Sequence, residues 1–566
     1  MSDGRDFRIR PGRIRSRGAE RARPFIAQAL AAVRRAGGQV SRSGRITPGK
    51  RSYFGRGRTA SVRASRYLTA RSRHVVIKTR VVRHAARGAP LATHLTYLRR
   101  EGVTRDGEKA QMFGPEREPA DARAFAERCA DDRHHFRFIV SPEDAGDMAN
   151  LKTFTRDLMR RVETDLGTKL DWVGVDHWNT GQPHIHVILR GRADDGQDLV
   201  IARDYIKDGM RARARDLVTQ ELGPRTDLDI SRALARQLDS ERWTDLDREL
   251  SREAGHQPDA FHAFKAGRLR KLESLGLANR VASGQWVIAE KAEATLRELG
   301  ERGDIIKRIH RGLMERGIER GTASYVLAGE SLDDPVMGRL VARGLDDELK
   351  GTAFAVIDGI DGRTHHVKLP DLDAADGAPG AIVELRKFDD ARGRRRVALA
   401  VRSDIPLEAQ VAATGATWLD RQAIAREPVP LGDGGFGAEV RDALERRADH
   451  LIGEGFAQRQ GRRVVFTRNL LETLRRREID DLGAKIAAEN GLTYNTAAAG
   501  DYATGTYRQR FALASGRFAM LDDGLGFRLV PWTPSLEKQL GRHVSGVMRG
   551  DGGVDWSFGR TKGLGL

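Results

Sequence analysis

Three histidines stand close together in the segment WVGVDHWNTGQPHIHVIL, which runs from Trp172 to Leu189. His177, His184 and His186 fall within ten residues, although the whole chain of 566 residues has only 15 histidines. Residues two apart in a strand share a face, so His184 and His186 point the same way. The turn-rich stretch before them can fold the preceding strand back antiparallel and bring His177 opposite His184. We expect three imidazoles that hold a divalent metal ion and leave coordination positions open, as catalytic sites do.

The alternative for a histidine pair of this kind is a structural role, in which hydrogen bonds hold each ring. The third histidine at this spacing favours the metal site over that alternative. Three neutral imidazoles bind the later transition metals tightly, so Zn, Ni or Co suits the site by intrinsic affinity. Mg or Mn is expected in the cell because both ions are abundant there. A divalent metal ion is therefore the predicted cofactor.

A tyrosine that lies off the apolar stripe of a predicted helix is the candidate nucleophile. Tyr97 belongs to LATHLTYLRREG, which we expect to be a helix that ends at Gly102. The stripe is formed by leucines, and Tyr97 falls roughly 120° from its centre at 100° per residue. A phenol has a pKa near 10 and needs a metal or a base nearby to act as a nucleophile at neutral pH. Tyr67, in the segment ASRYLTARSRH, is the competitor.

Polar residues on two predicted strands are expected to support this chemistry. In HVVIKTRVV, alternation places Lys78 and Arg80 on one face and valines and an isoleucine on the other, which suits a sheet that lies on a ligand. Ser141 ends the strand in FRFIVSPED. The pattern S-P-E-D is typical of a helix N-cap followed by proline at the first helical position. A serine at a helix N-terminus can also bind phosphate.

The order of these motifs resembles that of relaxases, the mobilisation nucleases of conjugative plasmids within the HUH endonuclease class, and of their Ti-plasmid border-nicking type in particular. The segment T-Y-L-R-R-E-G is similar to the family's Tyr-Leu-x-Arg-x-Gly, in which Glu101 falls at the variable position before Gly102. Ser141 corresponds to the family's middle motif, and the pattern H-x6-H-x-H corresponds to its histidines. Asn179 stands where the family often has aspartate. The resemblance covers about residues 74 to 223.

The resemblance implies an enzyme that nicks one DNA strand at a transfer origin. Tyr97 would attack the scissile phosphate and stay on the 5′ end, which leaves a free 3′-OH. The implied partners are single-stranded DNA at the transfer origin, accessory proteins of the relaxosome, and the coupling protein of a type IV secretion system that passes the protein and strand to a recipient cell. A histidine-triad nucleotide hydrolase is disfavoured, because Ile188 stands where a third alternating histidine is required. A non-enzymatic DNA-binding regulator with a structural metal stays the alternative.

Positive charge is concentrated at the beginning of the chain. Residues 1–100 contain 26 Lys+Arg and three acids, so they carry +23, whereas the whole chain carries +19. Arginine binds phosphate bidentately and its contacts release counterions, so nucleic acid is the leading partner and an acidic membrane surface the lesser one. No apolar run approaches the roughly 20 residues of a membrane span, and no secretory signal opens the sequence. We expect a cytoplasmic protein without stable membrane insertion, in which the single cysteine, Cys129, has a packing role.

The expected fold class is α+β. A basic mobile arm (1–72) precedes an antiparallel-sheet relaxase domain of the HUH type (73–225). The segments 268–299 and 446–476 both read helix, hairpin, helix. They predict a helical region with a winged-helix-like module (226–349) and a second such module (406–500). A small β-barrel-like module (350–405) lies between them, and a β-rich piece with a tail (501–566) follows. Winged helices bind DNA or dock proteins, and the sequence leaves both open.

Overall fold

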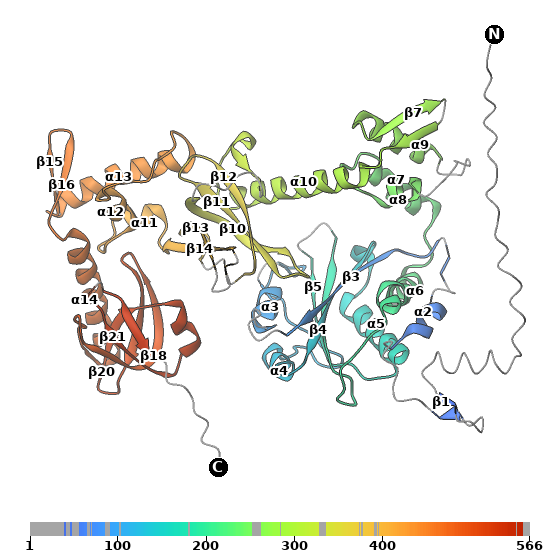
Figure 1. The fold of residues 1–566 in the computed structure, drawn as a ribbon, viewed down its shortest axis with the longest axis horizontal. Helices are drawn as coiled ribbons and strands as arrows, with labels where there is room; N and C mark the ends of the chain where they lie inside the picture. Colours follow the sequence, from blue (N-terminus) through green and yellow to red (C-terminus); the bar gives the residue numbers. More distant parts are fainter. Residues whose placement is uncertain are drawn as a thin grey trace, which may run out of the picture. The chain divides into compact units, whose positions relative to one another are not determined.

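The computed structural model describes residues 39–40, 46–47, 56–64, 68–69, 71–84, 91–100, 103–178, 182–251, 262–282, 285–327, 336–372, 374, 377–389, 393, 395–550 and 552–557. Tyr67, Asn179 and most of the predicted arm lie outside the described residues. The chain divides into two compact units, Met1–Thr226 and Asp227–Leu566, and Figure 1 labels many of their helices and strands. The division lies one residue beyond the predicted end of the relaxase domain at residue 225.

The centre of the first unit is a four-stranded antiparallel sheet with the strand order β3-β4-β6-β5. These strands are β3 (Val75–Arg83), β4 (His134–Pro142), β5 (Trp172–His177) and β6 (His184–Arg190). The loop between β5 and β6 makes a hairpin of two adjacent strands, as the sequence predicts. The mixed α+β class with antiparallel sheets is confirmed, whereas the finer HUH topology stays a prediction.

Helices pack on both faces of this sheet (Figure 1). On one face, α5 (Leu151–Leu166) and α6 (Met210–Leu222) enclose the main core with alternate residues of the strands. Asn150 caps α5 by accepting hydrogen bonds from two backbone amides, and Gly167 ends the helix with a φ of 63°. On the other face, α3 (Leu91–Leu98) and α4 (Ala122–Arg128) cover parts of β5 and β6. The histidines lie on this second face.

The ordered part of the first unit begins earlier than the sequence predicts. Two short strands, β1 (Gln39–Val40) and β2 (Ile46–Thr47), pair antiparallel within the predicted arm. The helix α2 (Arg58–Ala64) lies against the π-helical turn η3 (Tyr205–Gly209), and the Ser61 hydroxyl donates to the Asp204 carbonyl at 3.0 Å. Arg56 pairs with Asp195 at 3.0 Å. The prediction of a mobile arm over residues 1–72 is therefore wrong for residues 56–64, because their partners lie about 140 residues later in the chain.

The second unit contains the same arrangement of elements twice. The first repeat (227–403) has helices α7 (Asp227–Leu238), α8 (Asp245–Leu250) and α9 (His262–Ser274), the hairpin β7–β8 (Ala278–Ala282 and Gln285–Ile288), and the long helix α10 (Ala292–Met314). The second repeat (407–557) has α11 (Leu407–Val411), α12 (Trp418–Ala423) and α13 (Gly435–Gly453), the hairpin β15–β16 (Ala457–Gln460 and Arg463–Phe466), and α14 (Leu470–Asn490). Figure 1 shows the first repeat from green to yellow and the second from orange to red.

Each repeat ends in a six-stranded sheet of one topology. The first sheet has the order β14-β13-β10-β11-β12-β9 and the second has the order β22-β21-β18-β19-β20-β17. In both, the first short strand pairs parallel with the last strand of a three-stranded meander. The first sheet comprises Tyr325–Val326, Met337–Asp347, Thr352–Gly359, Thr364–Leu369, Ile382–Asp389 and Arg395–Ser403. The second comprises Thr493–Tyr494, Tyr502–Leu513, Gly516–Asp522, Gly526–Pro531, His543–Met548 and Val554–Ser557.

These sheets correct the predicted boundaries of the β-rich module. The first sheet includes β9 and β10, so it begins near residue 325 rather than at 350. Among the described strands, no pairing joins β9 to β14, so the hydrogen-bonded order is that of an open sheet and the predicted barrel is not closed by backbone pairing. In the described part of the chain, no helix has both the length and the apolar composition needed to cross a membrane.

Candidate metal and nucleophile site

The three histidines come together at one end of the β5–β6 hairpin. His177 is the last residue of β5 and pairs across the strands with His184, the first residue of β6. His186 shares the face of His184 and lies opposite Val175. The ring centroids are 4.5 to 5.5 Å apart. One nitrogen of each ring lies within 4.8 Å of the other two. The predicted convergence of the three imidazoles is therefore present, and all three side chains are buried.

Hydrogen bonds to backbone carbonyls orient two of the rings. His177 Nε2 lies 2.8 Å from the Leu98 carbonyl oxygen, and His184 Nδ1 lies 3.1 Å from the Gln182 carbonyl oxygen. A carbonyl oxygen can only accept, so each of these nitrogens carries the proton in a neutral ring. The lone pair then lies on Nδ1 of His177 and on Nε2 of His184. Metal-binding histidines are usually held in this way through their second nitrogen.

The spacing of the donor atoms suits a small divalent ion. His184 Nε2 and His186 Nε2 are 3.2 Å apart. Two nitrogens that each bind Zn at about 2.1 Å, at angles from octahedral to tetrahedral, are separated by about 3.0–3.4 Å. The donor set is three imidazoles, which later transition metals favour. The residues therefore fit a metal ion. The coarse conclusion that this cluster can hold a metal follows from geometry, whereas the identity of the ion stays a prediction.

The helix that carries Tyr97 ends beside this cluster. The helix α3 stops at Leu98 and not at Gly102, because the chain leaves the helix through turns at Arg99 and Arg100. Leu95 and Leu98 are buried, and Tyr97 is half-buried on a different side, as the stripe predicts. The hydrogen bond from His177 Nε2 to the Leu98 carbonyl joins the residue after Tyr97 to the histidines, although the two positions are 79 residues apart. The Arg100 guanidinium lies over the Tyr97 ring, 4.4 Å from its centroid.

Cations continue the histidine face of the sheet across β3 and β4. Lys78 pairs with Ile139, which pairs with His186, so Lys78 and His186 stand in one cross-strand row. Arg80 pairs with Arg137 in the adjacent row, and the side chains of Lys78 and Arg80 are exposed. The prediction that these two basic residues lie on the face opposite Val75 and Ile77 agrees with the strand register, and the structure adds that this is the face of the histidines. Their role at a ligand stays a prediction.

Sequence reasoning missed Arg137 and His135 on the same face of β4. Loss of hydration and the nearby Arg80 lower the pKa of Arg137 to about 10. Loss of hydration, then the charge of Arg137, lowers the pKa of His135 to about 3, so this ring is neutral near pH 7. Arg137 Nε donates to His135 Nε2 at 3.1 Å. The alternation of HHFRFIVSP was the available signal, because it places these residues on the side opposite the phenylalanines.

Ser141 lies in a strand rather than at the start of a helix. It is the next-to-last residue of β4 and pairs with Val76, and Pro142 is also part of the strand. The only helical turn nearby, η2 (Ala145–Asp147), begins three residues after Pro142. The predicted N-cap is therefore wrong, because pairing with β3 extends the strand through S-P. Ser141 is one residue beyond the last β4–β6 pair, Val140 with Ile185, at the edge where the histidines lie.

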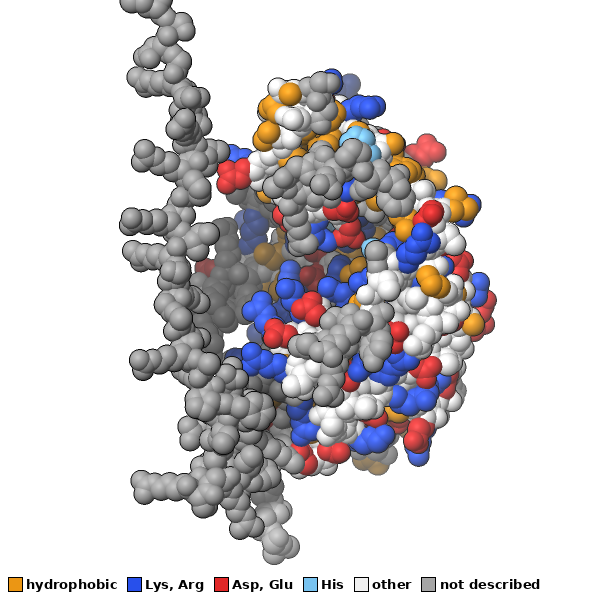
Figure 2. Space-filling model, turned by 90° about the vertical axis from the view of Figure 1, so that its right-hand side faces the viewer, with side chains coloured by type: hydrophobic (Ala, Val, Ile, Leu, Met, Phe, Trp, Pro, Cys, Tyr) orange, Lys and Arg blue, Asp and Glu red, His pale blue; other side chains and the backbone are white. Residues whose placement is uncertain are grey.

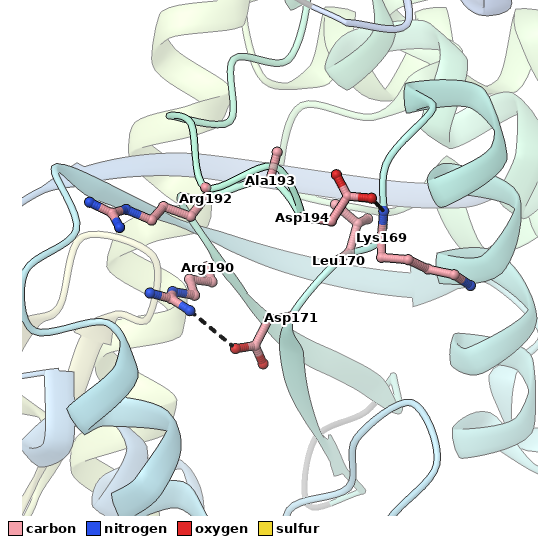
Figure 3. Close-up of a pocket in the computed structure, with 8 residues that line it drawn as sticks. Lys169, Leu170, Asp171, Arg190, Arg192, Ala193 and Asp194 are labelled. Atoms are coloured by element: carbon pink, nitrogen blue, oxygen red, sulfur yellow. Dashed lines mark hydrogen bonds and ion pairs between the residues drawn. The ribbon is translucent and has the colours of Figure 1, made fainter.

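A hollow at the end of β5 and β6 opposite to the histidines is less suited to a ligand (Figure 3). Its cavity of about 360 Å³ is lined by residues that include Lys169, Asp171, Arg190 and Arg192. Its arginines are already engaged in ion pairs, because Arg190 and Arg192 both pair with Asp132, at 2.7 and 3.2 Å. Lys169 pairs with Glu163 at 2.9 Å. On the face of the molecule that Figure 2 shows, basic and acidic side chains are interspersed, and neither charge forms a separate patch on the described residues.

Comparison with known proteins bears on the second unit. No curated protein matches the sequence. Two overlapping segments, residues 265–392 and 384–565, match the family described as "Protein of unknown function (DUF3363)". The matched residues cover parts of both repeats of the second unit and leave the histidine cluster outside. Because the two segments together span more than half of the chain, the protein belongs to the DUF3363 family.

Proposed function

We propose that the first unit is a DNA relaxase, which nicks one strand at a transfer origin by transesterification on Tyr97. The observation that carries this proposal is the 2.8 Å hydrogen bond from His177 Nε2 to the Leu98 carbonyl. It joins the end of the helix that bears the only candidate nucleophile among the described residues to the histidine cluster. The resemblance of the motifs to the relaxase family gives the same assignment of roles.

In this proposal, single-stranded DNA crosses the sheet face that bears Lys78 and Arg80, whose charges hold its phosphates. His177, His184 and His186 hold a divalent ion, which polarises the scissile phosphate when it is bound. The Tyr97 oxygen forms a bond to phosphorus while the bond from phosphorus to the 3′-oxygen breaks. The phenolic proton is lost and the released 3′-oxygen gains one. The products are a 5′-phosphotyrosyl strand and a free 3′-OH. One phosphoester replaces another, so the linkage retains the energy for later rejoining.

The remaining residues have supporting roles in the proposal. Ser141 lies at the histidine edge of β4 and can donate its hydroxyl to a phosphate oxygen. Asn179, outside the described residues, follows His177 in the loop of the hairpin. Arg100, over the Tyr97 ring, brings a positive charge next to the position that the phosphate would take. Arg137 adds a further cation to the DNA face.

The wider setting of the proposal is conjugative transfer from a donor cell. The protein would act in the cytoplasm with relaxosome accessory proteins and then pass to a recipient with the attached strand, through a type IV coupling protein. In each repeat of the second unit, three helices precede a two-stranded hairpin, which is the order found in winged helices. We propose that these modules dock DNA or a protein of the relaxosome.

The nucleophile is tested with Tyr97→Phe, which removes only the phenolic oxygen. Nicking of a supercoiled plasmid that carries the cognate transfer origin should stop, while stability changes by no more than about 1 kcal/mol. Tyr502→Phe is the matched control, because Tyr502 is 72% exposed in the second unit. Mass spectrometry after protease digestion should find a phosphotyrosyl peptide that contains THLTYLR. An adduct on Tyr67 would move the nucleophile there, and continued cutting by Tyr97→Phe without any adduct would refute the proposal.

The metal site is tested with His184→Ala and His186→Ala. Each change should abolish nicking and weaken metal binding by about tenfold or more, while binding of single-stranded DNA persists on the basic face. The measurement is calorimetric titration of Zn, Ni and Mn into each protein, with the exposed His310→Ala as the control. Equal metal binding by all variants would contradict the site. A regulator with a structural metal would instead lose stability on metal removal and shift the plasmid without nicking it.

A further inference from the structure

The two repeats of the second unit correspond residue by residue near their helices. Thr244 and Thr417 each cap a short helix in a capping box, with Asp247 and Asp420 as the partners. The sequence around these caps reads T-D-L-D-R in the first repeat and T-W-L-D-R in the second. The beginnings of α10 and α14 read A-E-A-T-L-R and L-L-E-T-L-R. Arg248 therefore corresponds to Arg421, and Arg297 corresponds to Arg475.

In the first repeat, both of these arginines are neutralised by a carboxylate on their own helix. Arg248 pairs with Asp245, three residues earlier. Arg297 pairs with Glu293, four residues earlier, at 2.6 Å. Pairs with these spacings lie on one face of a helix and neutralise each other locally. The first repeat therefore leaves neither cation available for a ligand.

In the second repeat, both carboxylates are replaced by apolar residues. Trp418 occupies the position of Asp245, and Leu471 occupies the position of Glu293. Arg421 donates to the Ser515 carbonyl at 2.8 Å, and Arg475 donates to the Gly552 carbonyl at 3.3 Å. Among the described residues, neither arginine forms an ion pair. The nearest acids are engaged elsewhere, because Asp420 pairs with Arg447 and Glu472 pairs with Arg476.

The two arginines line one hollow between α14 and the C-terminal sheet. Partial loss of hydration and the nearby charge of Arg475 lower the pKa of Arg421, so the two cations are close enough to repel each other. The cavity has a volume of about 810 Å³, within the range of small-molecule sites. Asp480, which accepts a hydrogen bond from the Tyr494 hydroxyl at 3.3 Å, also lines it. The apolar part of the wall consists of Leu471, Ile479, Phe518, Leu529, Pro531 and Met548.

We propose that this hollow binds a nucleoside phosphate, with its phosphate between Arg421 and Arg475 and its base and sugar against the apolar wall. Two arginines without ion pairs suit a phosphate, which accepts bidentate hydrogen bonds from each. The apolar wall suits a base, and Asp480 can accept a hydrogen bond from the N–H groups of that base. An aliphatic carboxylate ligand fits less well, because it has no N–H group to donate to Asp480 and carries the same sign of charge. The ligand is either a free nucleotide or one nucleotide of a single strand.

The experiment is calorimetric titration of thymidine 5′-monophosphate into the full chain. Arg421→Met and Arg475→Met should each weaken binding by about tenfold or more, because each removes a charged hydrogen bond to phosphate. The corresponding first-repeat variants, Arg248→Met and Arg297→Met, should leave the affinity within about twofold, since those arginines are neutralised by their own helices. Leu471→Glu restores the carboxylate of the first repeat and should weaken binding like Arg475→Met. Leu471→Gln, which has a similar size without the charge, should weaken it less.

Two further probes distinguish the sources of the ligand. Binding of the monophosphate but not of an oligothymidylate indicates a free nucleotide. Binding of the oligothymidylate alone, with the same loss in the two arginine variants, indicates a nucleotide within a strand. The proposal is overturned if no probe binds, if Arg421→Met and Arg475→Met bind like the wild type, or if inorganic phosphate binds as tightly as the monophosphate. The Tyr97→Phe variant should bind the monophosphate as the wild type does, so a failure of the nicking proposal can be told apart from a failure of this one.

Discussion

The buried pair of Arg447 and Asp420 gives a quantitative test of how each repeat of the second unit is held together. Arg447 donates five hydrogen bonds, two to the Asp420 carboxylate at 2.8 and 2.9 Å and three to backbone carbonyls of Val411, Ala413 and Gly415. Both side chains are at most 2% exposed. The first repeat has the same network, in which Arg268 binds Asp247 and three carbonyls.

Arg447→Met should destabilise the second repeat strongly, because it leaves the Asp420 carboxylate buried without its cation. Removal of one partner of a buried pair costs about 3–5 kcal/mol. For a domain of about 150 residues, each kcal/mol lowers the unfolding midpoint by about 2–4 °C, so we expect a decrease of about 6–20 °C. Arg446→Met is the matched control, since Arg446 is 46% exposed and solvent screens its pairs with Glu408 and Asp442, so its loss should change the unfolding midpoint little.

The assay is calorimetric unfolding of the full chain together with hydrogen exchange of peptides from α11, α12 and α13. Exchange should accelerate in the second repeat and remain unchanged in α7–α9. The double variant Arg447→Met with Asp420→Leu should recover part of the loss, because it removes the uncompensated buried charge, although the amide and hydroxyl of Thr417 then lose their acceptor. Equal midpoints for Arg447→Met and Arg446→Met would refute the reasoning, and so would a double variant that is less stable than Arg447→Met alone.

Two further predictions concern the first unit. Deletion of residues 1–55 should weaken binding to DNA of any sequence and reduce the slope of log affinity against log salt by about 0.7–0.9 per lost phosphate contact. Deletion to residue 72 should also destabilise the fold, because α2 packs on η3. An unchanged salt slope in the shorter deletion would show that the arm does not contact DNA. The folded pKa of His135 is about 3, against an ordinary 6.5, so stability should be lost as pH falls from about 6.5 towards 3. His135→Gln should reduce this loss in urea unfolding measured across that range, and an unchanged pH profile would contradict it.

Local patterns in the sequence predicted the parts of the site that depend on neighbouring residues. The period of two in a strand correctly put His184 and His186 on one face, and the turn-rich loop correctly brought His177 opposite His184. Alternation in HVVIKTRVV likewise placed Lys78 and Arg80 away from the buried Val75 and Ile77. The same pattern failed at Val81, which is 47% exposed, because burial at that end of β3 depends on elements that are distant in the chain.

Only the tertiary structure decided which distant segments meet. The Leu98 carbonyl reaches His177, residues 56–64 pack on η3, and β4 extends through Ser141 because β3 pairs with it. The helix–hairpin–helix repetition was visible in the sequence, but the common order of the two six-stranded sheets was not. Strand order and side-chain contacts across a fold are set by pairing between residues far apart, and no local period records that pairing. For the same reason, the sequence contained Arg421 and Arg475 among 98 lysines and arginines, and only the fold brought those two to one hollow.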